Sequence, residues 1–411
     1  MLQNMRLIQA IGLAAVVTLA GCGGSNSTTT TNNAPVAFAE MGQADFLSLS
    51  PNRNAVAAAN TLAAPTGSVA TNGTLFYVAD TNNNRILGYR TPPAVNGKAA
   101  DFVIGQPDFA TTTAGTGTAA VLGLAHPSKV FISTGTGAGK LVVTDTANNR
   151  VLIWNSLPNP AGTSFTTPPD VVIGQADKVS HAAPSPPTAA SLNNPVGAML
   201  VNNQLFVADT NNNRALIYNT LSTGAAASVV IGQPDFVTTT ILAAGANTLR
   251  GPADVWSDGF LLLVSDRDNN RVLFWNQVPT TNGAAANIAL GQTSLTGTVV
   301  ALGGASSMRT PTSVSSDGQR IFVADSGNNR VLLFNGFPIA SGAAAYQAYG
   351  QGDLLHYTAN DDDQNNGSDV NSSGQPVASS RTLSTPTGVY AFNAVVYVSD
   401  TFNNRLMHFS Y

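Results

Sequence analysis

The sequence predicts an all-β protein and, within that class, a six-bladed β-propeller of four-stranded blades. Three observations predict it: one segment of eleven residues recurs six times, a second segment built around Gly-Gln recurs six times, and a proline opens each unit. Repeats at a fixed spacing are typical of architectures in which each unit adds its own part of the core.

The composition agrees with strands and turns. The chain has 411 residues but only one Glu and four Lys, whereas Gly, Thr, Val, Asn and Pro are abundant. Helices use Glu and Lys heavily on their exposed faces, so a chain this poor in them favours β-structure. A length of 411 residues is large for one compact domain, but a propeller grows blade by blade.

The first repeated feature has the pattern Asp-x-x-Asn-x-Arg, followed by an apolar run. Its copies lie at residues 79–89, 144–154, 208–218, 265–275, 324–334 and 399–409. Successive copies are 57 to 75 residues apart. This spacing accommodates four short strands with their connections, which is one propeller blade.

The other two features mark the ends of each unit. The prolines are Pro65, Pro127, Pro195, Pro252, Pro311 and Pro386, and the Gly-Gln pairs begin at residues 42, 105, 174, 232, 291 and 350. We expect strand A after the proline, strand B before the motif Asp, strand C after the motif Arg, and strand D before Gly-Gln. Turns such as Asn72-Gly73 separate strands A and B. Strands B and C are continuously apolar, as expected where both faces of a sheet are covered.

These motifs resemble those of the NHL-repeat family of propellers, and six matching units cover almost all of residues 35–411. The resemblance implies a rigid propeller scaffold. The sixth unit ends at Tyr411, directly after its strand C, while a spare Gly-Gln segment lies at 36–46. We therefore expect this N-terminal strand to complete the last blade and close the ring.

The N-terminal residues look like a targeting segment. Residues 1–21 contain Arg6 and the apolar run 7–20, and Leu19-Ala20-Gly21 precedes Cys22. This resembles a bacterial lipoprotein signal peptide, which implies a lipidated Cys22 followed by a linker over 22–34. Gly at position 23 favours the outer membrane of a Gram-negative cell envelope. The alternative is an ordinary secretory signal. Cys22 is the only cysteine, so no disulfide forms within one chain.

The repeated charged residues are predicted to hold the turns between strands B and C. Asp accepts hydrogen bonds from turn N–H groups, and Arg donates a forked pair. Six near-identical copies indicate a structural role, because a catalytic group is normally singular. The residues are Asp80/Arg85, Asp145/Arg150, Asp209/Arg214, Asp266/Arg271, Asp325/Arg330 and Asp400/Arg405.

We predict no catalytic residues, but one position breaks the repeat. Two residues after the opening prolines stand Gly67, Lys129, Gly197, Asp254, Ser313 and Gly388. Strand A lines the channel of a propeller, so His126, Lys129, Asp254 and Ser313 are candidates for a polar ligand site at its mouth. The alternative is a solvated lining that binds nothing specific. Only one of the residues preceding the prolines is His, which is no ligand set for zinc.

The last connection between blades is acidic. Asp361, Asp363 and Asn365 alternate like the start of a calcium loop, with Asp369 further on. However, Asn366 and Ser372 stand where such a loop requires Gly and Glu. A flexible acidic loop and a calcium site are both open, and no other cofactor is expected.

The predicted function is that of a cell-envelope lipoprotein whose propeller is a binding or protein-interaction scaffold. Its partner would be an envelope protein or a small ligand, with a lipid anchor in the membrane and a monomeric chain. The alternative is a metal-dependent extracytoplasmic lyase or hydrolase with its site at the channel. A net charge of −4 argues against nucleic acid.

Overall fold

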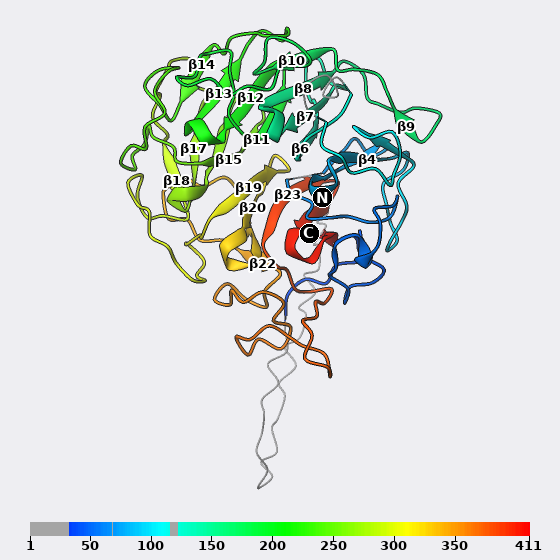
Figure 1. Ribbon diagram of the computed structural model, residues 1–411. Coiled ribbons are helices and arrows are strands. Elements are labelled where there is room, and N and C mark those ends of the chain that lie inside the picture. Colours follow the sequence, from blue (N-terminus) through cyan, green and yellow to red (C-terminus); the bar gives the residue numbers. More distant parts are fainter. Residues whose placement is uncertain (1–32, 68, 116–121) are drawn as a thin grey trace, which may run out of the picture.

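The computed structural model describes residues 33–67, 69–115 and 122–411, which form six antiparallel sheets around a central axis (Figure 1). The signal segment and Cys22 lie outside the described residues. Within those ranges the regular elements are strands and short 3₁₀ turns, with no α-helix and thus no apolar helix of membrane-spanning length. The prediction of a six-bladed all-β propeller is confirmed.

The first three blades follow the predicted order from strand A to strand D. Blade 1 contains β2 (Ala70–Thr71), β3 (Phe76–Asp80), β4 (Arg85–Tyr89) and β5 (Phe102–Ile104). Blade 2 contains β6 (Pro127–Ile132), β7 (Leu141–Asp145), β8 (Arg150–Trp154) and β10 (Val171–Ile173). Blade 3 contains β11 (Pro195–Val201), β12 (Gln204–Asp209), β13 (Arg214–Tyr218) and β14 (Val229–Ile231).

The last three blades repeat the pattern, except that blade 6 is made from both ends of the chain. Blade 4 contains β15 (Pro252–Ser257), β16 (Leu262–Asp266), β17 (Arg271–Trp275) and β18 (Ile288–Leu290). Blade 5 contains β19 (Pro311–Ser316), β20 (Ile321–Asp325), β21 (Arg330–Phe334) and β22 (Gln347–Tyr349). Blade 6 contains β23 (Pro386–Phe392), β24 (Val395–Asp400), β25 (Arg405–Ser410) and β1 (Ala39–Met41).

Strand β1 closes the ring as predicted. It pairs antiparallel with β25, with Ala39 opposite His408 and Met41 opposite Leu406. The side chain of Gln43, just beyond β1, donates to the carbonyl of Asn404 at 3.0 Å. Gln106 makes the equivalent bond to Asn84 within blade 1. Blade 6, which is made from both ends of the chain, therefore has the same hydrogen bond as a blade made from one continuous segment.

Blade 1 departs from the prediction of four strands. A fifth strand, β9 (Ser164–Phe165), pairs in parallel with β5 on the outer edge. It comes from the C–D connection of blade 2, which is long enough to reach across to its neighbour. The C–D connections of other blades cover the preceding edge with a pair of bonds: Gly224 N–H donates to the Val172 carbonyl at 3.0 Å, and Val172 N–H donates to the hydroxyl of Thr223 at 3.2 Å. An unpaired edge would invite pairing with another chain.

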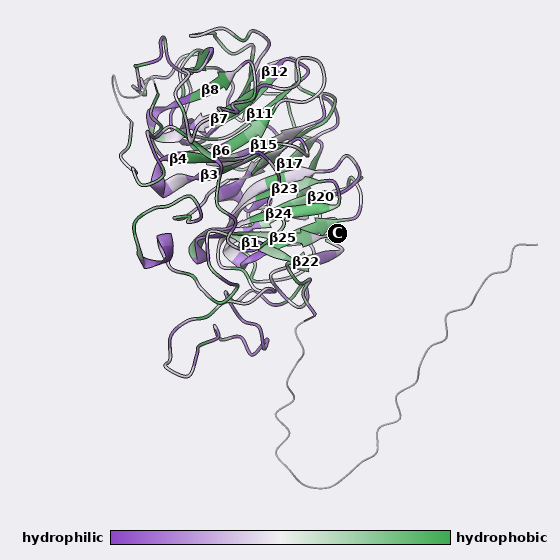
Figure 2. Ribbon diagram, turned by 90° about the vertical axis from the view of Figure 1, so that its right-hand side faces the viewer, coloured by the Kyte–Doolittle hydropathy of each residue, from purple (hydrophilic) through white to green (hydrophobic). Residues whose placement is uncertain are grey.

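The core lies between the blades, where the faces of neighbouring sheets meet. Strands B and C are buried along almost their whole length, as in Phe76–Asp80 and Arg85–Tyr89. Figure 2 shows the strands largely hydrophobic and many of the connections hydrophilic. The glycine of each Gly-Gln pair has a positive φ, and at Gly174 a Cβ atom would lie 2.5 Å from Leu192 of the linker to the next blade. Glycine is required there by both conformation and space.

Candidate functional site

The repeated Asp and Arg side chains fasten the end of each blade where strands B and C meet. In blade 3, Asp209 accepts a bond from Arg214 at 2.7 Å and another from the backbone N–H of Asn193 at 2.7 Å. Arg214 donates onward to carbonyl oxygens of the linker before the blade and of the linker after it. The side chains of all six pairs are fully buried. They are therefore out of reach of a ligand.

A second repeated residue ties each blade to the next. The Asn before each motif Arg has a left-handed backbone, and its side-chain oxygen accepts the N–H of the residue preceding the next proline. Asn213 does so with Gly251 at 2.9 Å. Asn404 does so with Ala64 at 2.7 Å, which joins blade 6 to blade 1. The B–C end of the propeller is thus a continuous ring of structural bonds.

The predicted polar residues meet in the channel at this B–C end. Lys129 on β6 forms an ion pair with Asp254 on β15, between blades 2 and 4. Asp254 also accepts bonds from the hydroxyl of Ser313 at 2.7 Å and the N–H of Val314 at 3.2 Å. A cavity of about 240 Å³ lies over them, and the exposed His126 lines it. Three of the four predicted residues, Lys129, Asp254 and Ser313, are therefore ion-paired or hydrogen-bonded to one another. A ligand at this site stays a prediction.

The channel is narrow at this level because glycines let the inner strands approach one another. A Cβ atom on Gly388 would lie 1.6 Å from the carbonyl oxygen of Gly67. A Cβ atom on Gly197 would lie 2.6 Å from the backbone of Asp254. Together with the Lys129–Asp254 pair, these contacts separate the two ends of the channel.

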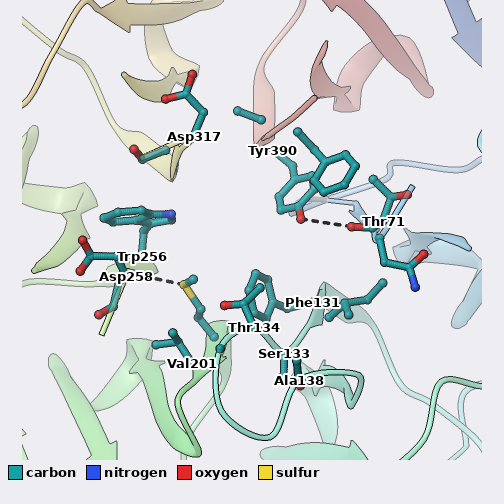
Figure 3. Close-up of a pocket in the computed structure, with 18 of the residues that line it drawn as sticks. Thr71, Phe131, Ser133, Thr134, Ala138, Val201, Trp256, Asp258, Asp317 and Tyr390 are labelled. Carbon is teal, nitrogen blue, oxygen red and sulfur yellow. Dashed lines mark hydrogen bonds between the residues drawn. The ribbon is translucent and has the colours of Figure 1, made fainter. Parts of the chain in front are cut away.

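A larger cavity lies at the opposite end, where strands A and B meet. It has a volume of about 770 Å³ and is lined by residues of all six blades. Figure 3 shows Phe131, Trp256 and Tyr390 around this hollow, with Met199 and Phe392 among its other large side chains. We call this cavity the funnel. Its lining is mostly apolar, as is usual for sites that bind small molecules.

The polar groups of the funnel are hydroxyls of Ser, Thr and Tyr residues, three neutral amides and two carboxylates. The amides belong to Asn72, Asn202 and Asn393, which are exposed in the A–B turns. The carboxylate of Asp258 accepts the N–H groups of its own turn, at 2.8 Å and 2.7 Å. That of Asp317 does the same and also pairs with Arg320. Among the described residues that line the funnel, none is Lys, Arg, His or Cys.

Sequence reasoning missed the funnel. It singled out the position two residues after each proline, whereas the funnel begins two residues further along strand A. There Phe131, Met199, Trp256 and Tyr390 line the cavity. The sequence does contain a signal for the funnel: at this position of strand A the side chains are large and differ between blades, although the strands otherwise repeat. It was overlooked because an apolar residue in a strand is usually part of the core.

The predicted calcium residues lie together in the connection between blades 5 and 6. Carboxylate oxygens of Asp361, Asp363 and Asp369 all lie within 4.8 Å of one another. Asp361 already accepts the N–H groups of Asn365 at 3.0 Å and Asn366 at 2.9 Å. Burial raises the pKa of Asp361 and of Asp369. The calcium site stays a prediction.

The four histidines lie apart. His408 is buried among Phe38, Phe76 and Tyr397, and burial lowers its pKa to about 3. His356 pairs with Asp353. Within the described part of the chain, the aspartate group above is the one set of three side chains placed to hold a metal ion. The described histidines therefore do not form a ligand set at the channel that would support the alternative of a metal-dependent lyase.

Glu40 is an unexpected feature of the closing strand. It is fully buried, its Oε2 accepts the N–H of Gln43 at 3.2 Å, and its Oε1 has no hydrogen-bond partner. Burial raises the pKa of Glu40 from 4.5 to about 7. The equivalent positions in the middle of the other D strands are apolar: Val103, Val172, Val230, Ala289 and Ala348.

Comparisons with known proteins give low similarity. No protein-family model and no curated protein matches the chain. Virginiamycin B lyase from Staphylococcus aureus is 11% identical with a TM-score of 0.41, covering 87% of this chain and 98% of that one. A streptogramin B lyase is 12% identical with a TM-score of 0.41, covering 90% and 95%.

An auxiliary nutrient-binding protein from Bacteroides thetaiotaomicron is 10% identical with a TM-score of 0.45, covering 92% of this chain and 76% of that one. Scores this low assign neither family nor function. The fold assignment rests on the six sheets of the chain itself, and the resemblance to NHL repeats rests on the repeated residues.

Proposed function

We propose that the chain is a lipid-anchored binding protein of the cell envelope and that the funnel is its ligand site. The observation that carries the proposal is a cavity of about 770 Å³ lined by aromatic and apolar side chains at one end of the channel. This volume falls in the range of about 300–1,000 Å³ typical of small-molecule sites. The rigid ring of repeated bonds at the other end supports binding by a preformed site.

The composition of the funnel favours binding over catalysis. General acid–base catalysis needs a titratable side chain positioned at the reacting group. The two carboxylates of the funnel, Asp258 and Asp317, are occupied by the N–H groups of their own turns. What the funnel offers a ligand is shape, aromatic surface and amide groups.

The topology supports an anchor on the side of the funnel. Strand β25 ends beside the A–B turn of its blade, where the N–H of Tyr411 donates to the carbonyl of Ala394 at 3.2 Å. Because β1 is antiparallel to β25, the chain enters β1 at this same end. The twelve residues from Cys22 to Asn33 span at most about 40–43 Å. A lipid on Cys22 would therefore tether the A–B side of the propeller, which carries the funnel, to the membrane surface.

Two experiments test the two parts of the proposal. Metabolic labelling with an alkyne fatty acid should label the parent protein and not Cys22→Ser, and only the parent should fractionate with membranes. A thermal-shift screen of small molecules should yield compounds that raise Tm for the parent and for Phe260→Ala but not for Trp256→Ala. Phe260 is a matched control, since it is an exposed aromatic residue in the adjacent turn outside the funnel. Compounds that bind equally well to Trp256→Ala would contradict the assignment of the funnel.

A further inference from the structure

We propose that the ligand of the funnel is the end of an uncharged oligosaccharide. This inference rests on the proposed function and deepens it, since it names the chemical class that the funnel takes. Three properties of the lining carry it: the placement of the aromatic side chains, the absence of cations, and the unused donors on the rim.

The aromatic side chains stand on alternate blades. Phe131 belongs to blade 2, Trp256 to blade 4 and Tyr390 to blade 6, and Figure 3 shows them on three sides of the hollow. The equivalent residues of blades 1, 3 and 5 are Ala70, Met199 and Ser315. The funnel is therefore a hollow with three aromatic walls. Such walls offer flat apolar surface at a low cost in conformational entropy.

Two of the three aromatic walls, Trp256 and Tyr390, pack against other rings. The ring of Trp256 lies 5.8 Å from that of Phe337, which in turn lies 6.0 Å from Phe274 in the core. Tyr390 stacks on Phe392 with an angle of 9° between the rings, and its hydroxyl lies 3.4 Å from the carbonyl oxygen of Thr71. These contacts fix the ring orientations before a ligand arrives, which favours a rigid ligand with flat faces.

The charges of the lining favour an uncharged ligand. A site for a phosphate or carboxylate group uses Arg, Lys or a cluster of N–H donors. The described lining contains no cationic residue, and both of its aspartates are exposed to solvent or engaged with their turns. An anion would meet two carboxylates and no cation, so anionic ligands are disfavoured.

The rim supplies hydrogen-bond donors. The side-chain oxygen of Asn72 accepts the N–H of Leu75 at 2.8 Å, and that of Asn202 accepts the N–H of Thr136 at 2.9 Å. Their oxygens are thereby directed at the protein, which leaves the NH₂ groups for solvent or a ligand. Asn393 adds a third exposed amide from blade 6. A sugar ring has an apolar C–H face and an edge of hydroxyl oxygens. The aromatic walls can pack against the C–H face, and the amide donors of the rim can bind the hydroxyl oxygens.

The volume indicates more than one sugar unit. A cavity of about 770 Å³ lies in the upper part of the range for drug-sized ligands. The funnel is closed below by the narrow part of the channel and open above. A chain end can therefore enter while the rest of the glycan remains outside.

The experiment is a calorimetric titration of the folded protein with a defined panel. The neutral members are maltohexaose, cellohexaose, laminarihexaose and hexa-N-acetylchitohexaose. The other arms are an oligogalacturonate as an anionic glycan, N-phenyl-1-naphthylamine as an apolar probe, and a neutral hexapeptide. We expect at least one neutral oligosaccharide to bind with a Kd of roughly 10 μM to 1 mM, and the anionic glycan to bind at least about tenfold more weakly.

Matched variants locate the binding. Trp256→Ala should weaken it at least about tenfold, and Phe260→Ala should not change it. Asn202→Asp removes the N–H donors that Asn202 contributes to the rim but keeps the oxygen that accepts from Thr136, and it should weaken binding several-fold. Asn203→Asp places the same charge one residue away, outside the lining, and should have little effect. If Trp256→Ala fails to fold, the comparison of Asn202→Asp with Asn203→Asp still tests whether the ligand binds in the funnel.

The outcomes separate the inference from the proposed function. Binding of the apolar probe or the peptide alone, lost in Trp256→Ala, would overturn the saccharide class but leave the funnel as a ligand site. Binding of an oligosaccharide that is unchanged in Trp256→Ala and Asn202→Asp would overturn both. Binding of no panel member would overturn the saccharide inference, while the thermal-shift screen decides the proposed function independently.

Discussion

The two ends of the channel are built from the same six inner strands but differ in what their side chains do. At the B–C end, repeated residues are buried and bonded to one another, and Lys129 pairs with Asp254 across the channel. At the A–B end, the side chains differ from blade to blade and enclose a cavity of about 770 Å³. The same scaffold thus carries a closed end and an open one.

This difference separates structure from function. Residues that occur in every blade bind the linkers and join neighbouring blades, so they stabilise the ring of blades. Residues that occur once are free to shape a site, because the turns of the A–B end are closed by their own backbone and by short side chains. Substitutions at the B–C end should therefore reduce stability, and substitutions in the funnel should reduce binding.

Deletion of residues 35–46 should have the largest effect. It removes β1, and with it the bond from Gln43 to Asn404 and the strand that covers β25. We expect a loss of roughly 5 kcal/mol or more in the free energy of unfolding, which is comparable to the whole stability of many domains. Scanning calorimetry would measure it, and a synthetic peptide of residues 33–46 should restore part of Tm. A deleted protein that melts like the parent would refute closure by β1.

Arg214→Met tests the repeated pairs. It leaves Asp209 buried without its cation, and the expected cost is about 3–5 kcal/mol. Arg267→Met is the control, since Arg267 also pairs with an Asp, Asp268, but with about a third of each side chain exposed. That change should cost less than about 1 kcal/mol. Urea unfolding of the two variants would measure the difference, and equal costs would contradict a structural role for the buried pair.

Glu40→Gln should stabilise the protein at alkaline pH. Because burial raises the folded-state pKa of Glu40 from 4.5 to about 7, the folded protein binds more protons than the unfolded chain between these values. The stability of the parent should therefore fall as pH rises through this window, by up to about 3 kcal/mol. The free energy of unfolding of the variant should not show this decrease. The variant should therefore be more stable than the parent at pH 8 but not at pH 4.5. Identical pH profiles in urea unfolding would show that Glu40 is not buried.

Lys129→Met should have the smallest effect of the four. It breaks the pair with Asp254, which keeps its bonds to Ser313 and Val314, and the expected cost is about 1.5–3 kcal/mol. Adding Asp254→Leu should recover much of the loss, since replacement of both partners of a buried pair is often nearly neutral. The double variant should bind funnel ligands as the parent does. A double variant that abolishes binding would move the site to the B–C end.

The sequence was sufficient to predict the fold because the fold is repeated. Six copies of Asp, Arg, Asn and Gly-Gln reveal the blades, their order and the closing strand without any long-range argument. The fifth strand of blade 1 was not predictable, since β9 forms from a connection whose sequence, Ser164–Phe165, gives no strand signal of its own. Its pairing depends on the neighbouring edge.

The sites were less predictable than the fold. Lys129, Asp254 and Ser313 stood out as polar residues on an inner strand, and they do meet, but the sequence could not show that they pair with one another. The funnel was invisible because Phe131, Trp256 and Tyr390 are far apart in the chain and look like core residues. Glu40 was noticed only as part of the closing strand, and its missing hydrogen-bond partner required the structure.

Hydrogen–deuterium exchange with and without a bound oligosaccharide of the panel would test the assignment of the open end most directly. We predict slower exchange in the A–B turns, at residues 72–75, 133–140, 201–204 and 392–395, with no change in the B–C turns at 81–84, 146–149 and 267–270. Protection of the B–C turns instead, with the A–B turns unchanged, would contradict the account.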